Sequence, residues 1–134
     1  MKKLAVLTIA SAVVLTGCSA TPYQSMKGSG GYRETRINET TYEITGRVNG
    51  VTRSYAARQF AMLRAADIAC SNGYRFFRIL DEHNHYPARQ SDFTTSVLKI
   101  QLTDNNLGQD YDAKIIMDDL AQSKKVRDSL SCTF

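Results

Sequence analysis

The sequence predicts a single α+β domain, a two-layer sandwich in which an antiparallel sheet of about four strands carries two helices on one face, in the order ββαββα. Three observations predict this fold. Residues 42–48 alternate apolar and polar side chains with a period of two, as a strand with one buried face does. Residues 53–71 instead repeat their apolar side chains at helical spacing. Short turns separate consecutive strands, which favours antiparallel pairing.

The first half of the domain is expected to begin with two strands. Residues 32–37 form the first strand, and Asn38-Glu39 forms the turn after it. The second strand ends at Asn49-Gly50. Its apolar face consists of Tyr42, Ile44 and Val48, and its polar face of Glu43, Thr45 and Arg47.

A helix is expected over about residues 53–71. Thr52 or Ser54 can cap its start, because either hydroxyl accepts a hydrogen bond from an amide of the first turn. Gly73 suits the left-handed position that ends a helix. The apolar stripe consists of Ala56, Phe60, Leu63, Ala66 and Cys70, widened by Met62 and Ala69. Its many alanines make the helix slim enough to lie close to a sheet.

Two more strands and a second helix are expected in the other half. Residues 74–80 form a strand, residues 81–92 an exposed loop or distorted hairpin, and residues 93–102 a strand. The last helix spans about residues 111–123, with Asp110 or Asp112 at its start. Leu98, Ile100 and Leu102 share the buried face of the fourth strand.

The N-terminus has the organisation of a bacterial lipoprotein signal. Lys2 and Lys3 precede an apolar segment, residues 4–15, that is too short to span a membrane. Leu15-Thr16-Gly17-Cys18 then forms a lipobox. We therefore expect residues 1–17 to be removed and Cys18 to carry a diacylglyceryl thioether and an amide-linked acyl chain such as palmitate, which anchors the protein in a bilayer.

Ser19, directly after Cys18, favours sorting to the outer membrane over the inner membrane, with the domain facing the periplasm. Residues 18–31 contain Pro22 and several glycines and serines, so they are expected to form a lipidated, flexible tether. The folded domain then covers residues 32–134, long enough for one modest core.

The charge of the chain argues against a nucleic-acid partner. Lys2 and Lys3 belong to the leader, so the 17 basic residues of the whole chain fall to 15, against 13 acidic ones. Basic and acidic residues are interleaved without a Lys/Arg block. We therefore expect a solvated surface of mixed charge, without the stripe of basic residues that binds a phosphate backbone.

Once Cys18 carries lipid, Cys70 and Cys132 are the cysteines that remain. An oxidising periplasm makes a disulfide between them plausible, which would hold the C-terminal tail on the central helix. The alternative is a small buried Cys70 and an exposed Cys132 thiol. The two are not in C-x-x-C spacing, which argues against a redox-active dithiol.

Asp67 is a carboxylate in the middle of the apolar stripe. Because an unpaired buried carboxylate is costly, we expect an ion pair with Arg64, an ion pair with a strand arginine such as Arg78, or hydrogen bonds from backbone amides. The functional alternative is a general acid or base with a raised pKa. Motifs for a serine nucleophile, a zinc hydrolase or a phosphate loop are absent from the sequence.

His83 and His85 form the only histidine pair, with Asp81, Glu82 and Asp92 nearby in sequence. A weak metal site is one interpretation and an ordinary polar loop is the other, and the latter is favoured because zinc and copper sites need three or four supported ligands. Several tyrosines could line a face that binds glycan or peptide, or could equally belong to the core and rim of the sheet: Tyr32, Tyr42, Tyr55, Tyr74 and Tyr86.

Five segments in ordered spacing resemble a family of small uncharacterised proteobacterial lipoproteins. They are Thr21-Pro22-Tyr23-Gln24 after the lipobox, Gly30-Gly31-Tyr32 with Thr35-Arg36, Arg64-Ala65-Ala66-Asp67, Gly73-Tyr74 with Phe77, and Tyr111-Asp112-Ala113. The resemblance covers most of the chain after the leader but not the 81–92 loop or the Cys132 tail. It implies a small envelope lipoprotein, and it supplies neither catalytic residues nor support for the disulfide.

The sequence thus predicts a non-enzymatic periplasmic module, held in the outer membrane by acylated Cys18, that binds an envelope protein or peptidoglycan and needs no cofactor or metal. Two alternatives stay open. One is an envelope enzyme that uses Asp67 or a metal at His83 and His85. The other is a passive structural lipoprotein.

Overall fold

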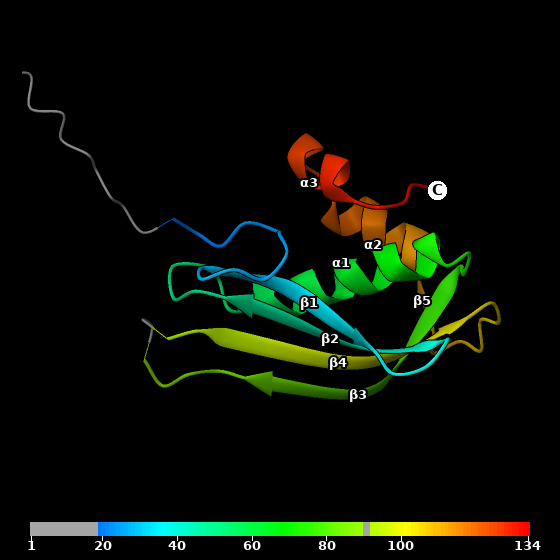
Figure 1. The fold of residues 1–134 in the computed structure, drawn as a ribbon, viewed down its shortest axis with the longest axis horizontal. Coiled ribbons are helices and arrows are strands. Elements are labelled where there is room, and N and C mark those ends of the chain that lie inside the picture. Colours follow the sequence, from blue (N-terminus) through cyan, green and yellow to red (C-terminus); the bar gives the residue numbers. More distant parts are fainter. Residues whose placement is uncertain (1–18, 90–91) are drawn as a thin grey trace, which may run out of the picture.

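In the computed structural model, which describes residues 19–89 and 92–134, five strands form one antiparallel sheet in the order β1-β2-β4-β3-β5 (Figure 1). Three helices lie on one face of this sheet and leave the other face bare. The predicted α+β class is confirmed. The elements are β1 (Gly30–Arg36), β2 (Thr41–Val48), α1 (Tyr55–Ser71), β3 (Phe76–His85), β4 (Thr94–Thr103), β5 (Tyr111–Asp112), α2 (Ala113–Leu120) and α3 (Lys124–Ser129).

The core lies between the sheet and α1, where the alternating patterns of β2 and β4 predict it. Tyr42 of β2 pairs with Ile100 of β4, Ile44 pairs with Leu98, and all four side chains are buried. Phe77 of β3 completes the apolar layer with none of its surface exposed. Helix α1 covers this layer, and α2 packs on α1 and beside β5. Helix α1 therefore lies between the sheet and α2.

Gly46 is the point of closest approach between β2 and α1. A Cβ atom added there would lie 1.9 Å from the carbonyl oxygen of Ala57. Only glycine on the strand and small residues on the facing turn of the helix permit this approach. The expectation of a slim helix lying close to the sheet is confirmed at this position.

The start of α1 differs from the expectation that a Thr52 or Ser54 side chain caps it. Ser54 is the residue before the helix, but its hydroxyl makes no capping bond. The Thr52 hydroxyl instead donates to Asn49 Oδ1 at 2.7 Å and accepts from the backbone N–H of Thr21 at 2.7 Å. Thr52 therefore ties the N-terminal segment to the domain.

Strand β3 extends through residues expected to form a loop. It continues to His85 and pairs with β4 throughout, with a bulge between Ile79 and Asp81. The bulge reverses the alternation, so that Glu82 and Asn84 lie on the helix side of the sheet. There Glu82 accepts from Arg58 of α1 at 2.6 Å, and Asn84 accepts from Ser96 of β4 at 2.6 Å. Polar partners thus replace apolar packing beyond the bulge.

The expected last helix, residues 111–123, is instead the short strand β5 followed by α2, which ends at Leu120, and a separate helix, α3, begins at Lys124. Asp112 caps α2 as predicted, because its carboxylate accepts from the N–H groups of Lys114 and Ile115. Ser123 has extended backbone and caps α3 by accepting from the N–H of Val126, so a new helix begins there. The Arg127 guanidinium donates to the carbonyls of Ala121 and Gln122 at the end of α2. This arrangement turns the chain back toward α1.

The expectation of a flexible tether is wrong for residues 19–31, because this segment packs against the domain. Thr21 is 5% exposed, and its hydroxyl donates to the carbonyl of Ser29 and accepts from the N–H of Asn49. Tyr23 packs edge-on against Phe60 of α1. The contacts with Asn49 and Thr52 join residues 28 and 31 positions apart, so the local Gly/Ser composition does not reveal them. None of the helices in the described residues has the length and hydropathy needed to cross a membrane.

Candidate functional site

Asp67 lies on the helix side of the core at a junction between α1 and the C-terminal tail. Its side chain is 1% exposed and pairs with Arg64 Nη1 at 3.0 Å. The carboxylate also accepts from the backbone N–H of Ser131 at 2.9 Å and of Cys132 at 3.1 Å. Of the partners expected for Asp67, the structure thus supplies Arg64 and backbone amides. Arg78 instead pairs with Asp110, at 3.2 Å.

Arg64 connects this junction to β1. Its guanidinium binds both carboxylate oxygens of Glu34 and lies 5.0 Å from the ring centroid of Tyr32. Burial lowers the pKa of Arg64, but the hydrogen bond and charge of Glu34 outweigh it, so the pKa is raised and the side chain stays charged. Tyr23 lies beside these groups, and burial raises the pKa of its phenol above the usual range. The cluster therefore holds its charges in fixed positions.

Cys70 and Cys132 join α1 to the tail at the same junction. They form a disulfide with 5.8 Å between their Cα atoms, across 62 positions of sequence. The backbone amide of Cys132 also donates to Asp67, next to that of Ser131. The disulfide thus holds Cys132, and hydrogen bonds to the Asp67 carboxylate hold both Ser131 and Cys132. We call this arrangement of Arg64, Asp67, Cys70, Ser131 and Cys132 the tail latch.

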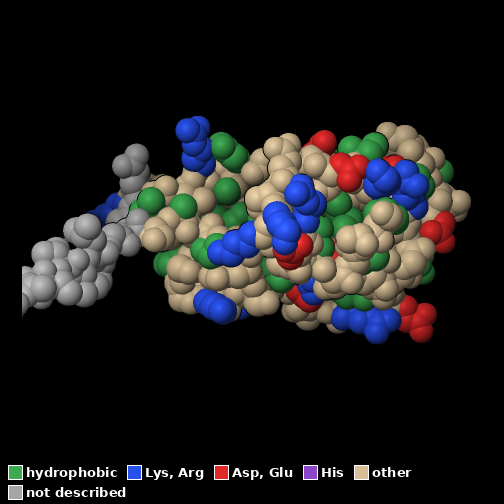
Figure 2. All heavy atoms as spheres, turned by 90° about the horizontal axis from the view of Figure 1, so that it is seen from above, with side chains coloured by type: hydrophobic (Ala, Val, Ile, Leu, Met, Phe, Trp, Pro, Cys, Tyr) green, Lys and Arg blue, Asp and Glu red, His purple; other side chains and the backbone are tan. Residues whose placement is uncertain are grey.

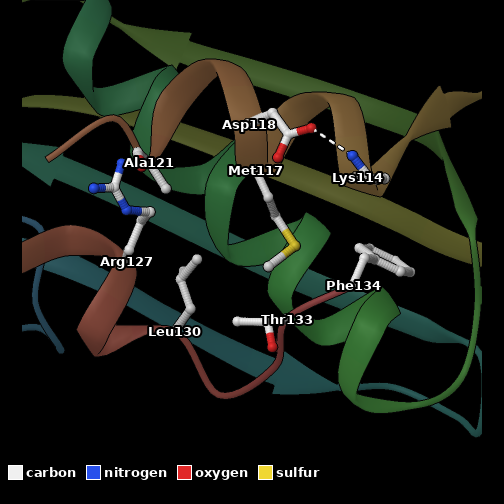
Figure 3. Close-up of a pocket in the computed structure, with 8 residues that line it drawn as sticks. All are labelled: Lys114, Met117, Asp118, Ala121, Arg127, Leu130, Thr133 and Phe134. Atoms are coloured by element: carbon white, nitrogen blue, oxygen red, sulfur yellow. Dashed lines mark hydrogen bonds and ion pairs between the residues drawn. The ribbon is translucent and has the colours of Figure 1, made fainter. Parts of the chain in front are cut away.

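A groove lies between α2, α3 and the tail that the tail latch holds in place (Figure 3). The groove encloses about 290 Å³. In Figure 3 the side chains of Met117 and Leu130 approach one another from α2 and from the end of α3, and they form an apolar floor with Ala121. Its lining residues are Lys114, Met117, Asp118, Ala121, Arg127, Leu130, Thr133 and Phe134.

The rim of the groove is charged and partly aromatic. Lys114 and Asp118 form an ion pair at 2.8 Å along one side, and Arg127 lies at one end. Phe134 stands at the other end with 53% of its surface exposed. Sequence patterns do not reveal this groove, because three segments separated by turns build it. The one available signal is Phe134, a large apolar residue that follows a polar stretch.

His83 and His85 lie on β3 and are exposed, and they face the bare side of the sheet by alternation beyond the bulge. His83 Nε2 contacts Asp81 Oδ2 at 2.9 Å. Within the residues the structure describes, no group of three or more His, Cys, Asp and Glu side chains is placed to hold a metal ion. The contact between His83 and Asp81 lies within β3 itself.

The tyrosines do not gather on one face. Tyr42 is buried in the core and Tyr74 is half-buried against it, whereas Tyr32 is half-buried beside Tyr23 and Arg64. Tyr55 and Tyr86 are exposed, by 55% and 61%. An aromatic binding face made of all five residues is therefore wrong.

Cys18, the expected lipidation site, lies outside the described residues, as does the leader of residues 1–17. Comparisons of the chain with protein-family models, with curated proteins and with solved structures found no match.

Proposed function

We propose that this chain is an outer-membrane lipoprotein, anchored through acylated Cys18, whose periplasmic domain is a non-enzymatic module that binds an envelope protein. The observation that carries the binding role is the preformed groove between α2, α3 and the tail. The anchor rests on the lipobox and the leader before it.

The groove has the chemistry of a site for one or two apolar side chains of a partner. Its volume of about 290 Å³ lies at the lower end of the range for small-ligand pockets, about 300–1,000 Å³. Met117 and Leu130 supply the apolar floor, and the ion pair and Arg127 at the rim supply orienting polar contacts. Exposed Phe134 adds the kind of aromatic contact that concentrates binding energy at protein interfaces.

The environment of Asp67 supports a positioning role over acid or base catalysis. Both carboxylate oxygens accept hydrogen bonds, from Arg64 and from two tail amides. A general base needs a lone pair free to take a proton from a substrate within hydrogen-bond reach. Here the carboxylate is occupied in holding the tail that forms one wall of the groove.

The anchor is tested by Cys18→Ser in cells. We expect the parent protein to fractionate with the outer membrane and the variant to appear in the soluble periplasmic fraction. Sedimentation of the variant with the outer membrane would contradict the anchor.

The binding role is tested by placing a photoreactive amino acid at Phe134 in the otherwise unchanged protein. Ile37 is the control position, since it is 50% exposed and does not line the groove. We expect one discrete adduct with an envelope protein from position 134, and none from position 37. Thr133→Trp, which fills the groove from an exposed position, should abolish that adduct. Equal labelling at both positions, or turnover of a cell-wall fragment without an adduct, would contradict the proposal.

A further inference from the structure

We propose that the end of the domain formed by the β2–α1 and β3–β4 connections is a second membrane contact, which lies on the anionic headgroups of the bilayer that holds Cys18. We call it the bilayer-facing end and define it by Val51, Arg53, Tyr86 and Arg89. The proposal rests on the proposed function only through the lipid anchor. It adds an orientation of the domain that the anchor alone does not require.

The first step is the position of the chain where it leaves the domain toward Cys18. Asn49 Nδ2 donates to the carbonyl of Ser19 at 2.8 Å, and Thr21 is bonded to both Asn49 and Thr52. Because consecutive Cα atoms are about 3.8 Å apart, an acylated residue directly before Ser19 is confined to this end. The anchor therefore brings the bilayer surface close to the β2–α1 connection.

The second step is the chemistry of the surface that the anchor brings to the bilayer. Val51 is 57% exposed and Tyr86 is 61% exposed, on the two sides of a hollow of about 420 Å³. Arg53 and Arg89 line the same hollow, with Asp92 as the single acidic residue among its lining residues. Tyrosine is enriched where protein meets headgroups, and arginine binds lipid phosphates while its stem covers apolar surface.

The third step is the distribution of charge over the molecule. On the face drawn in Figure 2, basic and apolar side chains without acidic ones occupy the left end, which is the end of the β2–α1 connection in Figure 1, whereas acidic and basic side chains are mixed over the other half. An anionic surface therefore attracts this end of the domain more strongly than the other. Each arginine held near such a surface contributes about fivefold to membrane affinity.

The contact can be weak and still orient the domain, because the acyl anchor holds it at high effective concentration. Its consequence concerns the groove. The C-terminal segment lies toward the end of the domain opposite the β2–α1 connection (Figure 1). With the bilayer-facing end on the membrane, the groove beside Phe134 is open to the periplasm and accessible to a partner.

The experiment uses the absence of tryptophan from the sequence. Tyr86→Trp places a single indole in the bilayer-facing end. Leu107→Trp is the matched control, since Leu107 is 70% exposed in the β4–β5 connection, which Figure 1 places at the opposite end. Each acylated, full-length mature protein is reconstituted into vesicles of phosphatidylcholine and phosphatidylglycerol, with brominated lipid as the quencher. Flotation of the vesicles reports the anchor separately from the fluorescence.

We expect both proteins to float and only the indole at position 86 to be quenched. Replacing Arg53 and Arg89 by glutamine should reduce that quenching, as should high salt, whereas Arg36→Gln with Lys125→Gln removes the same charge elsewhere and should leave it unchanged. Flotation with equal quenching at positions 86 and 107 would overturn the oriented contact and leave the anchor standing. Failure of the acylated proteins to float would overturn both. Quenching that is unchanged in vesicles of phosphatidylcholine alone would overturn the role of anionic headgroups.

Discussion

Replacing Asp67 by asparagine tests whether the tail latch stabilises the domain. The substitution keeps the shape of the side chain and removes its charge. An asparagine Oδ1 can still accept from the amides of Ser131 and Cys132, but its NH2 group then faces the Arg64 guanidinium, which is also a donor. The buried ion pair at 3.0 Å is lost.

The structure sets the expected size of the effect. A hydrogen bond to a charged group contributes about 1.5–3 kcal/mol. Arg64 keeps its contacts with Glu34, so it is not left as an unpaired charge, and the lower part of that range applies. We expect Asp67→Asn to lower the free energy of unfolding by about 2 kcal/mol. For a domain of this size this corresponds to a fall in Tm of about 8 °C.

Urea denaturation and thermal melts of the oxidised protein measure this loss. Asp118→Asn is the matched control, because Asp118 is 65% exposed and pairs with Lys114 on the surface, where such pairs contribute at most about 1 kcal/mol. A double-mutant cycle with Arg64→Met should give a coupling of about 1–2 kcal/mol. If Asp67→Asn costs no more than Asp118→Asn, the latch does not stabilise the tail and the reasoning is refuted.

Three further changes test other parts of the structure. Gly46→Ala should destabilise the domain by about 2–3 kcal/mol, because the added methyl group collides with the backbone of Ala57. The control Gly28→Ala should be neutral, because a Cβ atom there meets nothing within 4 Å. Equal melting temperatures of the two variants would disprove the close approach of β2 and α1. Replacing Cys70 and Cys132 together by serine should lower the free energy of unfolding by about 4 kcal/mol, since the disulfide closes a long loop. Peptide mapping of the unreduced parent protein should show the two cysteines linked, and two free thiols in the unfolded parent would contradict this. Asp112→Ala should cost about 1 kcal/mol by removing the cap of α2, and Asp112→Asn should cost less. The hydrogen bond from Arg75 lowers the pKa of Asp112 in the folded protein. The charge of Asp112 therefore stabilises the fold above the ordinary carboxyl pKa of about 4, and this stabilisation is lost as the pH falls through the lowered native pKa. A stability difference between wild type and Asp112→Asn that grows toward low pH would contradict this.

Much of the sheet could be predicted because its strands bury one face. In β2 and β4 the period of two places Ile44 opposite Leu98, as the structure does. β3 could be predicted only as far as its bulge, because beyond it both faces carry polar side chains and no apolar alternation remains. The break before α3 depends on Ser123, whose capping role is visible only once its extended backbone conformation is known.

The candidate site could be predicted in part. A carboxylate on an apolar helix face requires a partner, and Arg64 one turn away is visible in the sequence. The amides of Ser131 and Cys132 could not be identified, because they lie 64 and 65 residues away and carry no side-chain signal. The packing of residues 19–31 was concealed for the same reason, since Thr21 reaches partners 28 and 31 residues along the chain.

The bulge in β3 has a consequence for how the domain opens. On one side of it Phe77 and Ile100 belong to the large apolar core. On the other side the helix face of β3 carries Glu82 and Asn84, and the smaller cluster at that end of the sheet consists of Val48, Ala56 and Ala57 with Phe60 against it. Segments with little buried apolar surface unfold locally at a lower free energy, so the amide hydrogens of β3 after the bulge should exchange with solvent before those of its first residues. This weaker half is also the half nearest to Ser19. Contact with a bilayer would therefore reinforce the domain where its own packing is thinnest.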